Sequence, residues 1–365
     1  MLKTIEIDYI YQPLIDAPPI PMEVMWQQAC AGDKTTVESW RPTWIENFKK
    51  NKQHFGDFGP HSYGKLYGIN RHKPAIVIGS GPSLKNSVDA LIENKRMKHP
   101  VLTISALHNF GYFQDLSDEH GINVHADYYM SLDSGKIVLG DVHESCKREP
   151  EYYWEKSKGH KLIAYVASDT GLFESWKGEV YLFNCLLPDM ELRAELNNIE
   201  RFSNYISSGG NCSGACMYTA KAVMGSNPIL YVGVDFCFDY NNTFHSYKTH
   251  YDTLGEYVLH PDCHGVPRKT WRSYLAFKFA VDTFALSIPG DWISCSDGLV
   301  GAYREGNIRA FKYMPLSQAL LPYWMSERIF VGVKDKDGKV VGEPKKVELE
   351  DMFSNPKFED DLVCF

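Results

Sequence analysis

PAIVIGSGPSLKNSVDAL, residues 74–91, joins an apolar run to a glycine-rich turn and then to a polar stretch. The run at 75–78 is typical of a strand in a covered sheet, and the stretch from Ser83 has the composition of a helix. The turn between them, Gly79 to Ser83, can direct backbone N–H groups and two serine hydroxyls at an anion. The segment predicts a strand, an anion-binding turn and a helix. The alternative is a tight turn in which Ser83 only caps the helix.

Short apolar runs alternate with helix-compatible segments through the rest of the central chain. We expect further strands within 100–107, 126–133, 161–167, 179–184, 228–236 and 292–303. Helices are expected over 83–96 and over 211–225, the second ending at Gly225. This alternation is typical of a mostly parallel sheet with helices on both faces, so the sequence predicts an α/β fold of the doubly wound kind.

The two ends of the chain differ in composition from this central region. Residues 1–35 contain several prolines and are expected to be extended, whereas 38–55 carry aromatic and charged residues at helical spacing. Near the other end, 327–349 predict a β-hairpin with Asp337-Gly338 at its turn. We therefore divide the chain into an N-terminal extension at 1–72, a central α/β domain at 73–312 and a C-terminal appendage at 313–365.

The composition narrows the class of protein. The 365 residues are 44% hydrophobic and carry a formal net charge of −8, which does not favour non-specific binding to nucleic acid. No apolar run reaches the roughly 20 residues of a membrane helix, and the N-terminus lacks the pattern of a signal peptide. Nine scattered cysteines indicate reduced thiols, so we expect a cytoplasmic protein. The composition leaves open whether the protein forms a homo-oligomer, and whether nucleic acid, although disfavoured by the charge, is the acceptor in a transfer reaction.

Polar residues gather where the predicted strands end. Ser105 ends the second strand, Asp133 ends the third, and Asp235 ends the strand within 228–236. Together with the turn at Gly79, they fall at carboxyl ends of strands, where parallel sheets bind their ligands. This convergence predicts a ligand site at one edge of the sheet.

The glycine turn does not match two familiar phosphate-binding motifs. A P-loop needs a glycine followed by Lys and then Ser or Thr, but Lys85 follows Leu84 and precedes Asn86. The dinucleotide fingerprint needs a third glycine where Leu84 stands, and an acidic residue after the second strand, where the chain has Ser105 and Ala106. The sequence therefore argues against a nicotinamide cofactor.

Two later segments offer further candidates. A second glycine-rich turn, Ser207–Gly210, precedes the helix at 211–225 and suits an anion or a ribose hydroxyl. The strand after that helix leads to a polar stretch that contains Asp239 and His245. A histidine in such a loop is often only a surface residue, but its place beyond a strand end makes His245 a candidate for the site.

The segment 265–285 is expected to be a basic loop followed by an amphipathic helix. Arg268 and Lys269 lie in the loop, with Arg272 at the start of the helix. Arginine binds phosphate through two hydrogen bonds and lysine acts as a point charge, so these residues are candidates for neutralising a phosphate. An ordinary solvated surface is the alternative.

The blocks KPAIVIGSGPSLKNSVDAL, ADYYMSLDS, SGGN…VGVDFCF and SCSDGLVGA, in this order, resemble a domain shared by two groups of proteins. One group is the bacterial motility accessory factors, linked to attaching nonulosonic, sialic-like sugars to flagellin. The other is the archaeal 6-hydroxymethylpterin diphosphokinases. A more distant similarity is to bacterial CMP-sugar sialyltransferases with a Gly-x-Gly-Pro-Ser turn. The resemblance covers about residues 73–305 and implies a Rossmann-like fold that holds the phosphates of a nucleotide.

The resemblance also implies roles for single residues. The residues expected to line a nucleotide pocket are Gly79, Ser80, Gly81, Pro82, Ser83, Ser105, Gly209, Gly210 and Asn211. Asp133 and Asp235 match strand-end acids of the family, and His245 matches a histidine of the motility factors. Ser105 and Ala106 stand where the sialyltransferases have an asparagine, which weakens the match to a CMP-sugar. Their paired tyrosines are matched only loosely by Tyr240 and Tyr247.

Two kinds of transfer fit these residues. In glycosyl transfer from a nucleotide-sugar donor, Arg268 and Lys269 would stabilise the leaving phosphate, and His245 would activate the acceptor. In diphosphoryl transfer from ATP, the carboxylates Asp133, Asp235 and Asp239 would hold magnesium. Asp235 and Asp239 also suit a metal-assisted glycosyltransferase. We favour a glycosyltransferase, with the diphosphokinase and a non-catalytic nucleotide-binding assembly protein as alternatives.

Overall fold

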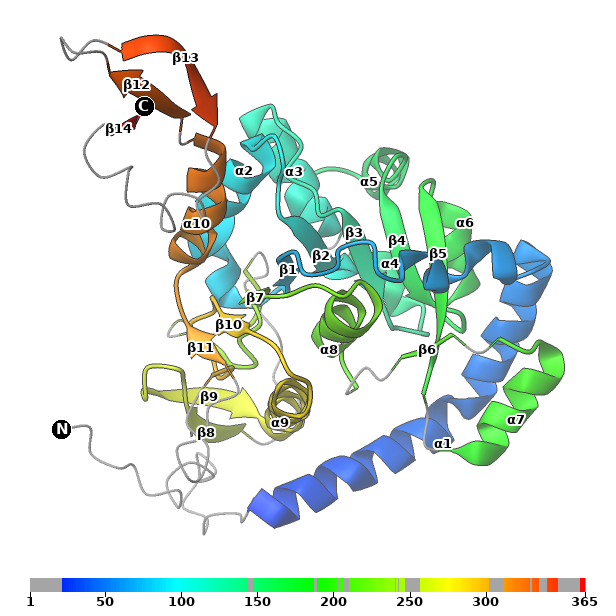
Figure 1. Ribbon diagram of the computed structural model, residues 1–365. Coiled ribbons are helices and arrows are strands. Elements are labelled where there is room, and N and C mark those ends of the chain that lie inside the picture. The colour runs from blue at the N-terminus through cyan, green and yellow to red at the C-terminus, as the bar shows by residue number, and fades with distance from the viewer. Residues whose placement is uncertain are drawn as a thin grey trace.

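The computed structural model describes most of the central chain and parts of both ends (Figure 1). The described residues are 22–143, 147–186, 189–202, 204–206, 210–239, 241, 243–246, 257–301, 311–328, 330–334, 340–346 and 362–364. Among the described helices, none combines the length and the apolar composition that crossing a bilayer requires.

A parallel sheet forms the centre of the molecule. Its strands lie in the order β11-β10-β7-β1-β2-β3-β4-β5-β6. Their bounds are β1 Ala75–Ile78, β2 Leu102–Ala106, β3 Tyr128–Ser131, β4 Lys161–Tyr165, β5 Glu179–Cys185, β6 Tyr205–Ile206, β7 Ile229–Val232, β10 Trp292–Ser294 and β11 Lys312–Tyr313. Ile78 at the end of β1 is in register with Ser105 on one side and with Val232 on the other. The predicted parallel α/β sheet is therefore confirmed.

Helices cover both faces of the sheet, with α2 and α3 on one side and α8 and α9 on the other (Figure 1). Their bounds are α2 Val88–Arg96, α3 Phe110–His120, α4 Ile137–Asp141, α5 Pro150–Lys156, α6 Thr170–Ser175, α7 Met190–Ile199, α8 Cys212–Tyr218, α9 Arg272–Ser287 and α10 Leu316–Arg328. A 3₁₀ turn, Pro82–Ser87, precedes α2. Gly225 has a φ of +78° beyond α8 and its π-helical continuation, Thr219–Val223, as expected for the end of a helix.

The first helix, α1 Met22–Phe55, is longer than its sequence suggested. The expectation that 1–35 are extended is wrong for residues 22–35, and 1–21 lie outside the described residues. Asn47 and Asn51 are buried in α1, and each donates two hydrogen bonds to backbone carbonyls after the strands. Asn47 Nδ2 lies 2.9 Å from the Ser134 oxygen, and Asn51 Nδ2 lies 2.8 Å from the oxygens of both Val166 and Ser168. These bonds fix α1 against the carboxyl edge of the sheet.

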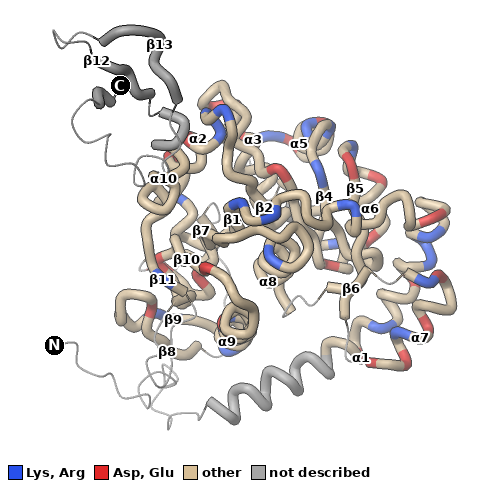
Figure 2. The backbone as a smooth tube through the Cα atoms, in the orientation of Figure 1, with Lys and Arg blue, Asp and Glu red and all other residues tan. Residues whose placement is uncertain are grey.

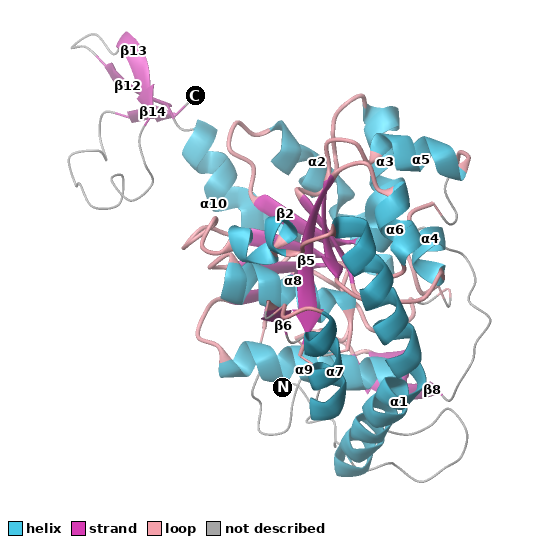
Figure 3. Cartoon of the chain, turned by 90° about the vertical axis from the view of Figure 1, so that its right-hand side faces the viewer, coloured by secondary structure: helices cyan, strands magenta, loops and turns pink. Residues whose placement is uncertain are grey.

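The same helix shares the hydrophobic core of the sheet. Val37, Trp44 and Phe48 of α1 are buried in one cluster with the strand residues. Figures 1 and 3 show α1 and α7 side by side, and segments of both signs of charge lie along the two helices (Figure 2). Arg41 accounts for part of this pattern, since its guanidinium lies 3.4 Å from Asp189 and 3.2 Å from Glu195. The buried side chains of α1 between Val37 and Asn51 thus pack the N-terminal helix on the sheet.

Two smaller sheets complete the structure. β8 Tyr257–Pro261 and β9 Pro267–Trp271 form an antiparallel pair, so the basic loop expected before α9 is a strand instead. The C-terminal hairpin is confirmed by β12 Phe330–Lys334 and β13 Val340–Lys346, and β14 Leu362–Cys364 adds a third strand. The predicted turn at Asp337-Gly338 lies outside the described residues.

We predict that Asn51→Ala lowers the free energy of unfolding by about 2 kcal/mol or more, because two buried hydrogen bonds between α1 and the loop after β4 are lost. Lys50→Ala, an exposed change on the same helix, is the matched control and should leave stability unchanged. Urea unfolding followed by circular dichroism measures both. Equal stability of the two variants would show that Asn51 does not anchor α1.

Candidate functional site

The strand order places the site at a switch point. β1 lies between β2 and β7, and the chain leaves these strands toward opposite edges of the sheet. In such a sheet a crevice opens beyond the carboxyl ends of the central strands. The turns after β1 and β7 therefore decide what the crevice presents to a ligand.

These two turns pack directly on each other. The Gly79 amide donates to the Val232 carbonyl at 2.8 Å, and the Gly81 amide donates to the Gly233 carbonyl at 2.7 Å. A Cβ atom on Gly79 would lie 2.5 Å from the Gly233 oxygen, and one on Gly81 would lie 2.5 Å from a carboxylate oxygen of Asp235. The glycines are therefore needed because another part of the protein backbone passes close to them.

The glycine turn holds a side chain of the protein itself. The Ser83 amide donates to Asp235 Oδ2 at 2.7 Å, and the Ser83 hydroxyl donates to Oδ1 at 2.5 Å. The Leu84 amide donates to the Gly81 carbonyl at 3.0 Å. The amides of Gly79, Gly81, Ser83 and Leu84 thus all have acceptors within the protein. The Asp235 carboxylate therefore occupies the start of the helix, where a ligand anion was expected, and anion binding by the turn stays a prediction.

Burial controls the ionisation of this carboxyl group. Asp235 is only 4% exposed, and removal from water raises its pKa to about 6. The two hydrogen bonds from Ser83 favour the ionised form and oppose this rise. Asp235 therefore changes its charge nearer to neutral pH than an ordinary aspartate does.

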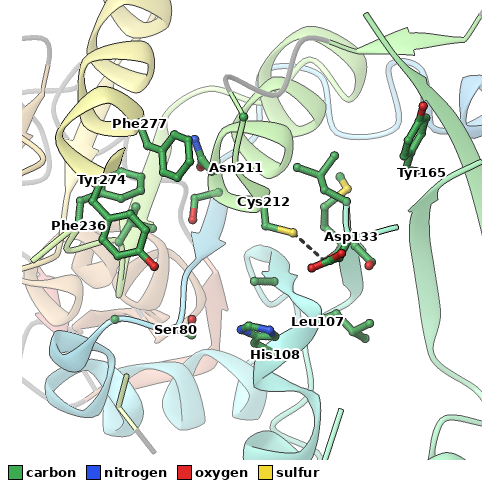
Figure 4. Close-up of a pocket in the computed structure, with 18 of the residues that line it drawn as sticks. Ser80, Leu107, His108, Asp133, Tyr165, Asn211, Cys212, Phe236, Tyr274 and Phe277 are labelled. Atoms are coloured by element: carbon green, nitrogen blue, oxygen red, sulfur yellow. Dashed lines mark hydrogen bonds between the residues drawn. The ribbon is translucent and has the colours of Figure 1, made fainter. Parts of the chain in front are cut away.

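A cavity of about 720 Å³ lies over the carboxyl ends of β1 to β5 and β7. Of the predicted site residues, those that line it are Ser80, Gly81, Asp133, Gly210, Asn211, Asp235 and His245. Figure 4 shows Phe236, Tyr274 and Phe277 on one side of the cavity and Asp133 and Tyr165 on the other. Asn211 and His108 lie between these two sides. The cavity is large enough for a nucleotide-sized ligand.

One wall of the cavity is aromatic. Phe244 stacks on Tyr274 of α9 with ring centroids 4.8 Å apart, and Tyr274 also contacts Phe236 and Phe277. We call these four residues, Phe236, Phe244, Tyr274 and Phe277, the aromatic wall. Flat apolar rings of this kind stack on nucleobases and on the apolar faces of sugars.

The opposite wall includes side chains of α1. Trp40 and Trp44 line the cavity, and Trp44 packs edge-on against Tyr165 with ring centroids 6.3 Å apart. Trp40 lies over Gly135, where an added Cβ would approach its ring to 2.9 Å. Asp133 is beside it and accepts the Gly135 amide at 2.8 Å. The family resemblance did not extend to α1, so this wall was missed.

Two histidines lie together in the cavity. His245 is buried, and its Nδ1 lies 3.1 Å from the Ser80 carbonyl oxygen. Since a carbonyl oxygen only accepts, Nδ1 of the neutral ring carries the proton and Nε2 is the acceptor. His108 lines the cavity opposite, with the two ring centroids 5.6 Å apart. Sequence reasoning found His245 but missed His108.

Several predicted residues are not among the described lining residues. Gly79, Pro82 and Ser83 lie within the turn, and Ser105 is buried beneath Asn109, which donates to the Ser105 hydroxyl and to the Gly79 carbonyl, both at 2.9 Å. Asp239 accepts the amides of Asn241 and Thr243, which makes it a turn-forming residue. Gly209, Tyr240 and Tyr247 lie outside the described residues.

The predicted phosphate-binding cations have other contacts. Arg268 Nε donates to the buried Asp262 at 2.8 Å within the β8–β9 pair. Lys269 Nζ lies 3.8 Å from the centroid of the Tyr257 ring. Neither belongs to the described lining of the cavity. Both residues lie on strand β9 rather than in a loop, and their contacts there are with the β8–β9 pair and its turn.

The predicted magnesium ligands do not fit a metal. Asp133 and Asp235 both line the cavity, but each oxygen of Asp235 already accepts a hydrogen bond from Ser83. Within the described part of the chain, no three His, Cys, Asp or Glu side chains are grouped so that they could hold an ion. Asn211, which also lines the cavity, accepts the Gly214 amide through its side-chain oxygen at 2.7 Å and caps α8.

The fold and the cavity define a Rossmann-like α/β protein with its ligand site at the switch point of a parallel sheet. The family model described as 6-hydroxymethylpterin diphosphokinase MptE-like matches residues 43–241. The chain belongs to this MptE-like family. The resemblance inferred from the glycine turn and the later motifs is thereby confirmed.

A solved structure, that of the MAf glycosyltransferase from Magnetospirillum magneticum AMB-1, has a similar fold. The TM-score is 0.51 at 16% sequence identity, over 76% of this chain and 39% of that chain. The present chain therefore spans about two fifths of the length of that glycosyltransferase. Among curated proteins, no match was found.

We predict that Gly79→Ala lowers the free energy of unfolding by about 2 kcal/mol, because its Cβ would collide with the Gly233 backbone. Gly140→Ala is the control: it lies in α4 with no atom within 4 Å of the added Cβ, and should be neutral or slightly stabilising. Thermal and urea unfolding compare the two. A Gly79→Ala protein as stable as the control would contradict the close packing of the turns.

Asp235 also predicts a pH dependence of stability. Because its folded pKa is raised, the folded state binds the extra proton, so its contribution is fully present below the unfolded pKa and is lost as pH rises through about 6. We expect the stability of the wild type, measured relative to Asp235→Asn, to fall by up to about 3 kcal/mol between pH 4 and pH 7. Urea unfolding of both proteins at each pH measures this difference. A difference that stays constant or grows with pH would refute the raised pKa.

Proposed function

We propose that this protein transfers a glycosyl group from a nucleotide-activated sugar to an acceptor hydroxyl. Two findings support a transferase that acts beside a nucleotide: the family model is named for a diphosphokinase, and the similar solved structure is a glycosyltransferase. The observation that carries the glycosyl assignment is His245, whose Nδ1 is fixed by the Ser80 carbonyl in a cavity with an aromatic wall.

The charges of the cavity favour a donor with little phosphate. None of the described residues that line it is a lysine or an arginine, whereas Asp133 and Asp235 add acidic groups. A triphosphate with its magnesium needs cations and metal-binding carboxylates, and the described residues supply neither in a suitable group. A nucleoside monophosphate linked to the sugar, as in a CMP-activated nonulosonic (sialic-like) donor, carries a single negative charge and suits this cavity better.

The arrangement supports a direct displacement. The base of the nucleotide stacks on the aromatic wall, which places the sugar toward His245. His245 Nε2 takes the proton of the acceptor hydroxyl, whose oxygen forms the new bond to the anomeric carbon. The bond from that carbon to the phosphate oxygen breaks, and its electron pair leaves with the nucleoside monophosphate. The reaction is balanced without a metal or a further reactant.

Replacement of the base tests this assignment. We predict that His245→Gln slows the release of CMP from CMP-N-acetylneuraminic acid at least about a hundredfold, since a positioned general base contributes about that much or more. The affinity for CMP should remain within about threefold of the wild-type value, as measured by calorimetry, because Gln can still donate to the Ser80 carbonyl. Turnover at the wild-type rate would remove His245 from the mechanism.

Thermal shifts with CMP, UDP, GDP and ATP, each with and without magnesium, separate the donor classes. A rise in melting temperature with CMP alone is expected. Stabilisation that requires ATP together with magnesium would instead favour the diphosphokinase. No response to any nucleotide would favour an assembly protein.

A further inference from the structure

Most amides of the glycine turn already have acceptors within the protein. The amides of Gly79, Gly81, Ser83 and Leu84 donate to acceptors inside the protein, and Asn211 caps its own helix. Arg268 is paired with Asp262, away from the cavity. If an anion is bound in this cavity, as the proposed function requires, the described lining residues offer it a positive partner only in their histidines, because none of them is a lysine or an arginine.

The described lining residues include two histidines, His108 and His245, whose side chains can carry a positive charge. They come from different strand ends, His108 from the 3₁₀ turn Leu107–Asn109 after β2 and His245 from the loop after β7. Their rings face each other edge to face with centroids 5.6 Å apart. Ser80, the lining residue whose carbonyl fixes His245, brings the glycine turn to the same place.

We propose that His108, in its protonated form, binds the phosphate of the donor and stabilises the negative charge that develops on it as the sugar leaves. This proposal rests on the proposed function and divides the histidine pair between two tasks. His245 is oriented by the Ser80 carbonyl to accept a proton, whereas His108 donates an N–H to the leaving phosphate. The phosphate takes the electron pair of the broken bond and remains hydrogen-bonded to the imidazolium.

Other titratable groups share the cavity with His108. The titratable side chains that line the cavity with it are Asp133, Asp235, His245, Tyr165, Tyr274, Cys185, Cys212 and Cys237. α3, α4 and β3 pack against the turn that carries His108, and Lys136 stands at the start of α4. A test of His108 must therefore separate its contribution from that of these neighbours.

A phosphodiester probe tests the proposal. Cytidine 5′-(methyl phosphate) keeps one negative charge between pH 5.5 and 8, as a CMP-sugar does, so a change in its affinity reports on the protein. We expect calorimetry to show an affinity that falls about tenfold or more across this range, while cytidine, which has no phosphate, shows no such change. His108→Gln should lower the affinity at pH 5.5 about tenfold and make its fall across this range several times smaller, the remainder coming from Asp235 and His245 in the same cavity. His120→Gln, an exposed histidine at the end of α3, is the matched control.

A second measurement does not depend on the nucleotide. The ring proton resonances of His108, assigned by comparison with His108→Gln, are titrated by NMR with and without sodium sulfate. Sulfate should raise the pH midpoint of His108, because the bound dianion stabilises the imidazolium. The midpoint of His120 should change little.

The outcomes separate the two proposals. If the diester binds and His108→Gln retains the affinity and pH dependence of the wild type, His108 is not the phosphate partner, although the nucleotide-binding function stands. If sulfate shifts the His108 midpoint but no nucleotide binds, the anion site stands and the proposed function falls. If neither sulfate nor any nucleotide affects the protein, both are overturned.

Discussion

The close packing of the turn after β1 on the turn after β7 is the constraint on which the rest of the site depends. It requires glycine at 79 and 81, because the Gly233 backbone and the Asp235 carboxylate occupy the space of their side chains. On the buried side of the turn, the amide and the hydroxyl of Ser83 donate hydrogen bonds to the Asp235 carboxylate. Toward the cavity, the Ser80 carbonyl accepts both the Ser246 amide and His245 Nδ1. One turn therefore joins the two halves of the sheet and orients the histidine beside it.

Much of the fold could be predicted from the sequence, because the strands of a covered parallel sheet are short continuous apolar runs. The strand β9 was not predictable in this way, since Arg268 and Lys269 interrupt its apolar pattern. Arg268 pairs with Asp262 in the turn after β8, and Lys269 lies over the Tyr257 ring of β8, contacts that no local pattern reveals. The start of α1 was missed for a similar reason: prolines nearby suggested an extended chain, whereas the helix begins at Met22.

Sequence reasoning placed Ser80, Asp133, Asp235 and His245 at one edge of the sheet, and all four line the cavity. It did not reveal the pairing of Ser83 with Asp235, because these two residues lie far apart in the chain. For the same reason it did not find His108, which becomes a candidate only because the fold places its ring beside that of His245. The residues at the strand ends could thus be predicted, but the pairs that they form across the crevice, Ser83 with Asp235 and His108 with His245, could not.

The family model covers only part of the cavity. The turns after β1 and β7 fall within the matched region, 43–241, whereas Thr36, Val37 and Trp40 precede it and the lining residues Phe244, His245, Tyr274 and Phe277 follow it. The three preceding side chains belong to α1, which Asn47 and Asn51 hold in place independently of the glycine turn. The shape of this side of the cavity can consequently change through substitutions in a single helical turn, while the packing of the glycine turn on the Gly233 backbone is unaffected. Variation at these three positions therefore alters what the cavity can hold without altering the strand ends beneath it.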